Sequence, residues 1–288
     1  MTHILLTGIA TLDIINQLDH YPVEDSEVRA QNQSIRIGGN ASNSAIVLQQ
    51  LGMNSHLLAK RADDVNANLI FSELENRQID TSLCPVQANS TTPTSYITLN
   101  SKNGSRSIIH YRNLAELQAA DFIKLDLSQY SWLHFEARDC LEQTEMLLHA
   151  QSFKIPISIE LEKNRDSIDD IMPFADILLL SKPFAESRGF TTAVDCLQDF
   201  SRRFKNKTIT CTWGDSGAWA YSHSEIIHQN AYKVAKPVET LGAGDTFNAG
   251  IIASLVRQEN ISQALSFACK LAAHKCQQTG LDLFTTPD

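Results

Sequence analysis

Ile177-Leu178-Leu179-Leu180 is a run of four apolar residues, and the segments on either side of it decide the fold. A central strand of a parallel sheet is covered on both faces, so it shows a continuous apolar run rather than alternation. A helical pattern at residues 193–204 follows the run, and a strand pattern at residues 208–213 follows the helix. This order predicts a βαβ unit with residues 177–180 as a central parallel strand.

The same alternation continues along most of the chain. Strand patterns occur at residues 4–8, 56–59, 132–135 and 157–159, helical patterns occur at residues 42–51, 69–78 and 141–151, and two more helices follow at the carboxyl end. Such alternation predicts the α/β class, with a mostly parallel sheet between two layers of helices.

Two segments break this alternation. Residues 12–37 contain no helical pattern, and residues 93–112 contain a hairpin whose turn is Lys102-Asn103-Gly104. Asn-Gly pairs favour tight hairpin turns. Because neither segment has helices to cover its strands, we expect both to form one small β-sheet that serves as a lid or a dimer surface. The core is then expected to comprise residues 1–11, 38–92 and 113–288.

Composition and charge argue against several classes of function. The 288 residues carry a net charge of −9 without a large basic cluster, which argues against a nucleic-acid partner. No apolar stretch approaches the ~20 residues that span a bilayer, and no signal-peptide pattern is visible, so we expect no membrane partner. The six cysteines are scattered without C-x-x-C spacing, which indicates reduced thiols in a cytoplasmic protein.

A glycine-rich segment late in the chain, Thr240-Leu241-Gly242-Ala243-Gly244-Asp245-Thr246-Phe247, opens a predicted helix. The free N–H groups and the positive dipole end of a helix N-terminus attract anions. Asp245 would repel a phosphate at this position unless it takes a proton from a hydroxyl that attacks the phosphate. On this segment alone, a glycine turn that merely caps a core helix is equally well supported.

A second glycine turn, Gly38-Gly39-Asn40-Ala41-Ser42-Asn43, also precedes a predicted helix. Asn40 and Asn43 lie on one face of its first turn, and their amides suit neighbouring sugar hydroxyls. The alternative is ordinary helix capping. Asp13 follows the first strand inside an apolar run. It either faces solvent on the lid, which its surroundings in the sequence favour, or contacts a ligand hydroxyl.

Trp213-Gly214-Asp215-Ser216-Gly217 follows a predicted strand, at the end where open α/β sheets bind ligands. It is either a nucleotide-binding turn or an ordinary hairpin turn. Arg106 in the hairpin and Arg138 after a strand could each clamp a phosphate, although a single arginine on a flap is usually only exposed. The sequence contains no Walker A motif, so a phosphate-binding loop has to be built in another way.

Taken in order, the two glycine turns resemble the two signatures of the PfkB (ribokinase-like) sugar kinases. Similarity to the ketohexokinase branch of that family extends over the chain in collinear order. It covers residues 19–27, 38–44, 132–138, 158–163 and 240–249, Phe267-Ala268-Cys269 and Lys275-Cys276.

The resemblance implies a three-layer α/β/α core with a mostly parallel sheet and a β lid that joins a homodimer. It implies that the γ-phosphate of ATP is transferred to a ketohexose, most simply from D-fructose to fructose 1-phosphate. Mg²⁺ is the implied ion, and K⁺ is a second candidate. The residues that would bind Mg²⁺ stay undetermined, because Ser181-Lys182-Pro183-Phe184 stands where many family members carry Asn-x-x-Glu. Ribose, a nucleoside or another ketose as acceptor stays open, as does a non-catalytic sensor.

The resemblance also implies roles for individual residues. Asp245 is implied as the catalytic base, with Gly242, Ala243 and Gly244 as the anion hole. The expected sugar-binding residues are Asp13, Asp25 (reaching the partner subunit), Gly39, Asn40, Asn43, Arg138 and Asp245. Arg138 is included because an arginine there could clamp a phosphate. The expected ATP-binding residues are Arg106, Gly214, Asp215, Ser216, Gly217, Gly242, Ala243, Gly244 and Cys269. Asp215 stands where ketohexokinases carry a glutamate.

Overall fold

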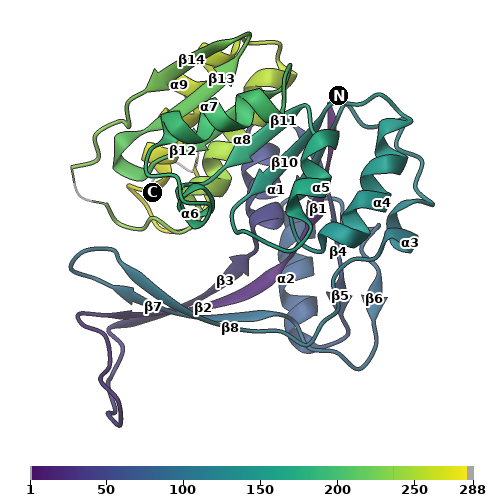
Figure 1. The fold of residues 1–288 in the computed structure, drawn as a ribbon. Coiled ribbons are helices and arrows are strands. Elements are labelled where there is room, and N and C mark those ends of the chain that lie inside the picture. Colours follow the sequence, from purple (N-terminus) through teal and green to yellow (C-terminus); the bar gives the residue numbers. More distant parts are fainter. Residues whose placement is uncertain (1, 236, 284–288) are drawn as a thin grey trace.

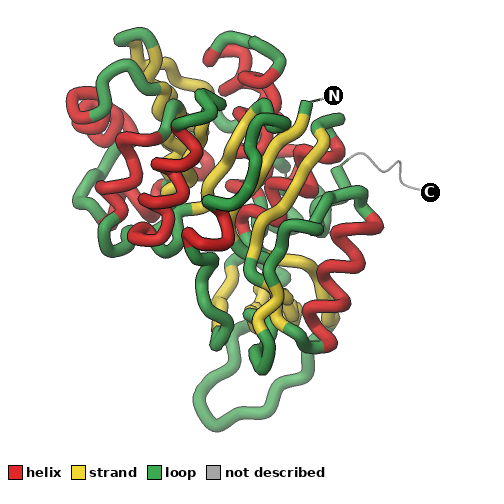
Figure 2. Tube along the Cα trace, turned by 90° about the vertical axis from the view of Figure 1, so that its right-hand side faces the viewer, coloured by secondary structure: helices red, strands yellow, loops and turns green. Residues whose placement is uncertain are grey.

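The computed structural model describes residues 2–235 and 237–283. Figure 1 shows a central sheet between layers of helices, with a smaller sheet that projects from one end of it. Turned by 90°, the tube in Figure 2 shows helices on both sides of the strands. The predicted α/β class is therefore confirmed. Among the described residues, no helix combines the length and the apolar character that crossing a membrane requires.

The central sheet has eight strands in the order β14-β13-β12-β11-β10-β9-β1-β4. Strand β11 pairs in parallel with both β10 and β12, as its apolar sequence predicts. Within the described residues, the antiparallel pairs of this sheet are at one edge, where β13 pairs with β12 and β14 pairs with β13. The strands are β1 (His3–Gly8), β4 (Asn54–Ala59), β9 (Trp132–Glu136), β10 (Ile157–Leu161), β11 (Ile177–Leu180), β12 (Thr208–Thr212), β13 (Ala218–Ser222) and β14 (Glu225–Gln229).

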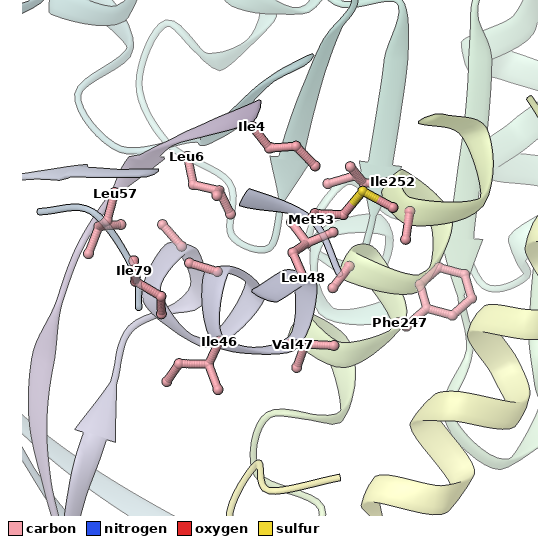
Figure 3. Close-up of a cluster of buried hydrophobic side chains, with 14 of the residues drawn as sticks. Ile4, Leu6, Ile46, Val47, Leu48, Met53, Leu57, Ile79, Phe247 and Ile252 are labelled. Atoms are coloured by element: carbon pink, nitrogen blue, oxygen red, sulfur yellow. The ribbon is translucent and has the colours of Figure 1, made fainter. Parts of the chain in front are cut away.

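Successive residues of β11 pack on opposite faces of the sheet. Ile177 and Leu179 belong to the apolar cluster that includes α1, α2, α8 and α9, part of which Figure 3 shows. Leu178 and Leu180 belong to the cluster that includes α3 to α7. The helices are α1 (Asn40–Gln50), α2 (Val65–Asn76), α3 (Ala119–Phe122), α4 (Cys140–Gln151), α5 (Ile168–Ile171), α6 (Lys182–Ser187), α7 (Ala193–Arg203), α8 (Ala243–Val256) and α9 (Ile261–Lys275), with short 3-10 helices η1 (Met172–Phe174) and η2 (Gly214–Ser216).

Helix α2 begins one turn earlier than its apolar pattern predicts. The side chain of Asp64 accepts a hydrogen bond from the backbone N–H of Ala67 and so caps the helix. Aspartate is a favoured N-cap residue, because its carboxylate accepts from an otherwise free N–H of the first turn. The buried side of this helix is formed by Ala67, Ile70, Phe71 and Leu74, whereas Leu69, where the apolar pattern begins, is exposed.

The smaller sheet, called the lid below, has four strands in the order β3-β2-β7-β8. Strands from the two predicted insertions meet where β2 pairs in parallel with β7. Its exposed apolar side chains include Tyr96, Ile108 and Ile109. The strands are β2 (Thr11–Leu18), β3 (Asn32–Gly38), β7 (Thr94–Asn100) and β8 (Arg106–Tyr111); a separate pair, β5 (Arg61–Ala62) and β6 (Val86–Gln87), lies beside the core.

Candidate functional site

A cavity of about 520 Å³, called the cleft below, lies between the lid and the carboxyl ends of the central strands. This is the edge at which open α/β sheets bind ligands. Strands β9 and β10 contribute acidic residues, the first turns of α1 and α8 contribute polar residues, and the lid closes one side. The residues on which the argument below depends are Asp13, Asn40, Asn43, Arg106, Glu160 and Asp245.

The late glycine turn forms the N-terminus of α8. Gly242 is the N-cap residue and has a φ of 79°, in the left-handed region that favours glycine. A Cβ atom added to Gly244 would meet no atom within 4 Å. The turn therefore leaves open space in front of the first N–H groups of the helix, which is the geometry of an anion-binding site.

Asp245 lies in the first turn of α8 and is buried. Its Oδ2 accepts a hydrogen bond of 2.6 Å from Nδ2 of Asn43, which lies on α1. Burial, together with the nearby carboxylates of Glu162, Glu136 and Asp13, raises the pKa of Asp245 to about 7 against the opposing effect of the hydrogen bond from Asn43. A carboxylate with a pKa near neutrality is well matched to accept a proton from a bound hydroxyl.

The early glycine turn is held tightly by its surroundings. Gly39 caps α1 with a φ of 98°, and a Cβ atom there would overlap the carbonyl oxygen of Ile9. A Cβ atom on Gly38 would overlap the carboxylate of Asp13. Both glycines are therefore required by the packing of the turn, as well as by its conformation.

Asp13 corrects an expectation, since its sequence surroundings favoured a solvent-facing position. Its side chain is buried where β2 borders the cleft, and Thr11 Oγ1 donates a hydrogen bond of 3.0 Å to its Oδ1. Burial raises the pKa of Asp13, although hydrogen bonds from Ser95 and Thr11 oppose this effect. The apolar residues beside Asp13 pack on the other side of the strand, so the local composition hides its orientation.

Three carboxylates of the cleft were not predicted from the sequence. Glu136 ends β9, and its Oε2 accepts hydrogen bonds from the backbone N–H groups of Ile9 (3.2 Å) and Ala41 (3.3 Å). Glu160 and Glu162 both accept a hydrogen bond from Nδ2 of Asn40, at 3.0 and 3.2 Å. The signal that could have identified them is their place at the ends of the predicted strands, where ligands bind.

Of the two acids that accept a hydrogen bond from Asn40, Glu160 is more deeply buried than Glu162. Its Oε2 has no hydrogen-bond partner among the described residues. Burial raises its pKa well above the usual range, and the charges of Asp245 and Glu136 add to the effect. An unpartnered buried oxygen is costly, so a ligand hydroxyl or a cation that reaches it would be bound favourably.

The two arginines differ in their surroundings. Arg138 is engaged by acids, because its Nη2 lies 2.7 Å from Glu116 Oε1 and its Nη1 lies 3.3 Å from Glu136 Oε1. Arg106 is exposed on β8, and its Nη1 donates a hydrogen bond of 3.2 Å to Thr240 Oγ1. Arg106 is thus a lid residue that contacts the glycine turn, whereas Arg138 stabilises the acidic wall of the cleft.

The remaining predicted residues lie outside the cleft lining. Gly214, Asp215 and Ser216 form η2 at the end of β12, and Gly217 follows with a φ of 94°. Cys269 lies on α9 and is buried in the core, which raises its thiol pKa to about 11. Asp25 is exposed in the loop between β2 and β3, which Figure 1 shows extending from the lid, away from the core.

Comparison with known proteins bears on the whole chain. Residues 1–287 match the model of the pfkB family carbohydrate kinases. The chain is 37% identical to ketohexokinase of Mus musculus over 97% of this chain and 97% of that protein. These matches confirm the family resemblance that the two glycine turns indicate.

Solved structures confirm the fold. A ribokinase of Giardia lamblia superposes with a TM-score of 0.85 at 15% identity, over 98% of this chain and 95% of that chain. Arabidopsis thaliana ribokinase complexed with ribose and ATP superposes with a TM-score of 0.81 at 19% identity, over 97% of this chain and 94% of that chain. The predicted ribokinase-like α/β core with a β lid is therefore correct.

Proposed function

The chain belongs to the pfkB family of carbohydrate kinases, which are phosphotransferases, and on that premise we propose that it phosphorylates a ketohexose with ATP. The proposed reaction converts D-fructose into fructose 1-phosphate. The 37% identity to a ketohexokinase supports this acceptor. The non-catalytic sensor is set aside, because the family assignment makes the chain a kinase.

The observation that carries the proposal is the buried Asp245–Asn43 pair at the N-terminus of α8. Asp245 takes the proton of the sugar hydroxyl as that oxygen attacks the γ-phosphorus of ATP. The new O–P bond forms while the bond between the γ-phosphorus and the bridging oxygen breaks, and ADP leaves with that oxygen. Asn43 holds one carboxylate oxygen, so the other can point toward the hydroxyl.

The turn of Gly242, Ala243 and Gly244 is proposed as the anion hole. Its N–H groups, together with the positive end of α8, would stabilise the negative charge on the transferred phosphoryl group. Fixed donors of this kind need no rearrangement at the moment of reaction, which is why they contribute strongly to catalysis. Arg106 would add a charge from the lid.

We propose that the sugar is bound on the lid side of the cleft, and that closure of the lid excludes water. Asp13, Asn40 and Asn43 offer carboxylate and amide groups to hydroxyls, and Gly39 offers its backbone. Arg138 would hold the acidic wall behind them. Asp25 of the partner subunit would reach the sugar if two lids pair through their exposed apolar faces, so a homodimer is part of the proposal.

ATP is proposed to bind across the end of β12 and the start of α8. Gly214, Asp215, Ser216 and Gly217 form a turn in which glycine permits close approach of a nucleotide to the backbone. Cys269 lies on α9 behind this region, so its buried side chain would shape the adenine side rather than react.

Mg²⁺ and K⁺ are the ions of the proposal. Among the described residues, no three acidic, histidine or cysteine side chains are arranged to hold a metal ion by themselves. Mg²⁺ in kinases needs only one or two carboxylates, because substrate phosphates and water complete its shell. The unpartnered Oε2 of Glu160 and the half-exposed Glu162 fit that requirement. Bound there, Mg²⁺ would neutralise charge on the ATP phosphates.

A coupled ADP-release screen tests the proposal. Fructose, other ketoses, ribose and nucleosides are each supplied with ATP and Mg²⁺, with KCl replaced by tetramethylammonium chloride in a parallel series. NMR of the product then identifies the phosphorylated hydroxyl. Fructose with the highest kcat/KM and a 1-phosphate product is the expected result. Preference for ribose or a nucleoside would overturn the acceptor assignment while leaving the kinase assignment intact.

A further inference from the structure

Lys275, the last residue of α9, has a completely buried side chain. Its ammonium nitrogen donates to two backbone carbonyl oxygens, those of Glu239 (3.3 Å) and Gln278 (3.5 Å). The carboxylate Oε1 of Glu239 lies 3.7 Å away. Burying an ammonium group is expensive unless it is paired and hydrogen-bonded, so three oxygens around one nitrogen mark a built position for a positive charge.

This position lies directly beneath the late glycine turn. The Cε atom of Lys275 is 3.8 Å from the place that a Cβ atom of Gly242 would occupy. The backbone N–H of Val238 donates to the carbonyl of Cys276 at 2.8 Å, so the loop that leads into the turn is held at the end of α9. Lys275 therefore holds the segment from Glu239 to Gly242 from below.

The same cluster reaches the lid. Arg36 of β3 donates a hydrogen bond of 2.7 Å to Oε2 of Glu239, whose side chain is almost fully buried. The three side chains together carry two positive charges and one negative charge. Glu239 is thus shared between a lid residue and a core residue, and the charge of Arg36 also acts on the carboxylate of Asp13, whose pKa it tends to lower.

A buried positive charge beside a helix N-terminus is unfavourable by itself, because the helix dipole is positive there. The arrangement becomes favourable when an anion binds at the same turn, since the ammonium group of Lys275 and the positive end of α8 then both attract that anion. Burial lowers the pKa of Lys275, but the Glu239 carboxylate opposes that effect and supports the charged form.

We propose that Lys275 is a positioning residue for phosphoryl transfer: its ammonium group fixes the Glu239–Gly242 segment and places a buried positive charge beneath the turn that binds the transferred phosphoryl group. The inference rests on the proposed function, because it needs the turn of Gly242 to be the anion hole. Lys275 touches neither substrate, so its effect is transmitted through Glu239 and Gly242.

The test is Lys275→Met in the full chain, with Lys270→Met as the matched control. Lys270 lies on the same helix and is exposed. Loss of the buried charge is expected to lower kcat roughly 10- to 100-fold, the scale of a lost electrostatic contact to the reacting group, with KM for the sugar changed less than about threefold. Thermal unfolding of both variants checks that the fold is intact.

Cation rescue separates a charge effect from a packing effect. In Lys275→Ala, methylammonium should fill the space next to Glu239 and restore kcat several-fold, whereas the bulkier tetramethylammonium should not. If Lys275→Met fails to fold, the double variant Lys275→Met with Glu239→Gln removes both buried charges and should fold with the same low kcat. If the wild type is active and the kcat of Lys275→Met is within twofold of the wild-type kcat, the inference is wrong. A wild type that releases no ADP with any sugar overturns the proposed function instead.

Discussion

The glycine turn ahead of α1 and the glycine turn ahead of α8 are joined by the hydrogen bond between Asn43 and Asp245, yet glycine serves a different purpose in each. Around Gly38 and Gly39, protein atoms occupy the space that a side chain would need. In front of Gly244 that space is empty. The first turn is glycine-rich because of packing inside the protein, and the second leaves room for something outside it.

This difference separates stability from function at the level of single residues. A substitution in the first turn has to disturb the fold before it can disturb a ligand. A substitution at Gly244 keeps the backbone conformation, because its φ is not in the left-handed region, and projects a methyl group into open space. Asp245, the acidic residue of the second turn, is the base of the proposed reaction, and Asn43 from the helix after the first turn holds it in place.

The largest effect is expected from Asp245→Asn. The amide keeps the size and the burial of the side chain but cannot accept the proton, so kcat should fall roughly 10³-fold. Steady-state ADP release measures kcat, and titration calorimetry with ATP should give a Kd close to that of the wild type. Asp170→Asn, an exposed acid on α5, is the matched control. A kcat within tenfold of the wild type would exclude Asp245 as the base.

The next effect contrasts Gly39→Ala with Gly244→Ala. Alanine at residue 39 would be strained at a φ of 98° and would overlap Ile9, so we expect it to lose roughly 3–4 kcal/mol of unfolding free energy. The Gly244→Ala variant should unfold at the same denaturant concentration as the wild type, but its kcat/KM should be about tenfold lower. Chemical denaturation gives the unfolding free energy of both variants, and initial rates give their kcat/KM. Equal stability losses would mean that the two turns do not differ in the way described.

A pH effect on stability follows from Asp245. Burial raises its pKa to about 7 in the folded protein, whereas an aspartate in an unfolded chain has a pKa of about 3.9, so the folded state keeps this proton up to a higher pH. The stabilisation is therefore complete below about pH 4 and is lost as the pH rises through 7, by about 4 kcal/mol. Asp245→Asn does not titrate. In denaturation of the ligand-free proteins, the unfolding free energy of the variant should rise relative to that of the wild type between pH 4 and pH 7. A difference in unfolding free energy that stays constant over this range would contradict the raised pKa.

The parts of the molecule that the sequence predicts are those set by local pattern. The run at residues 177–180 gives the bounds of β11, and the glycine turns mark the starts of α1 and α8 closely. Apolar periodicity and glycine conformation act over a few neighbouring residues, so they can be identified without the fold. The assignment of the chain to a sugar kinase family rests on the spacing and order of those same turns.

The parts that the sequence does not predict depend on contacts between distant residues. Asn40 meets Glu160 across 120 positions of the chain. Arg36 meets Glu239 across 203 positions, and Lys275 is indistinguishable in sequence from an exposed lysine at the end of a helix. Such contacts appear only when the lid, the turn and α9 are assembled, because no local pattern encodes which charges will be buried together.

The smallest effect is expected from Arg106→Ala, which removes a contact between the lid and the second turn. Arg106 is exposed, and its side chain donates a hydrogen bond of 3.2 Å to Thr240 beside the second turn. Its removal should leave the unfolding free energy within about 0.5 kcal/mol of the wild type, since exposed contacts contribute little. KM for ATP should rise several-fold if Arg106 binds the phosphates as proposed, because that positive charge is lost. Lys102→Ala in the same hairpin is the control, and an equal rise in KM for both variants would show that the effect comes from general lid charge rather than from the contact of Arg106 with the turn.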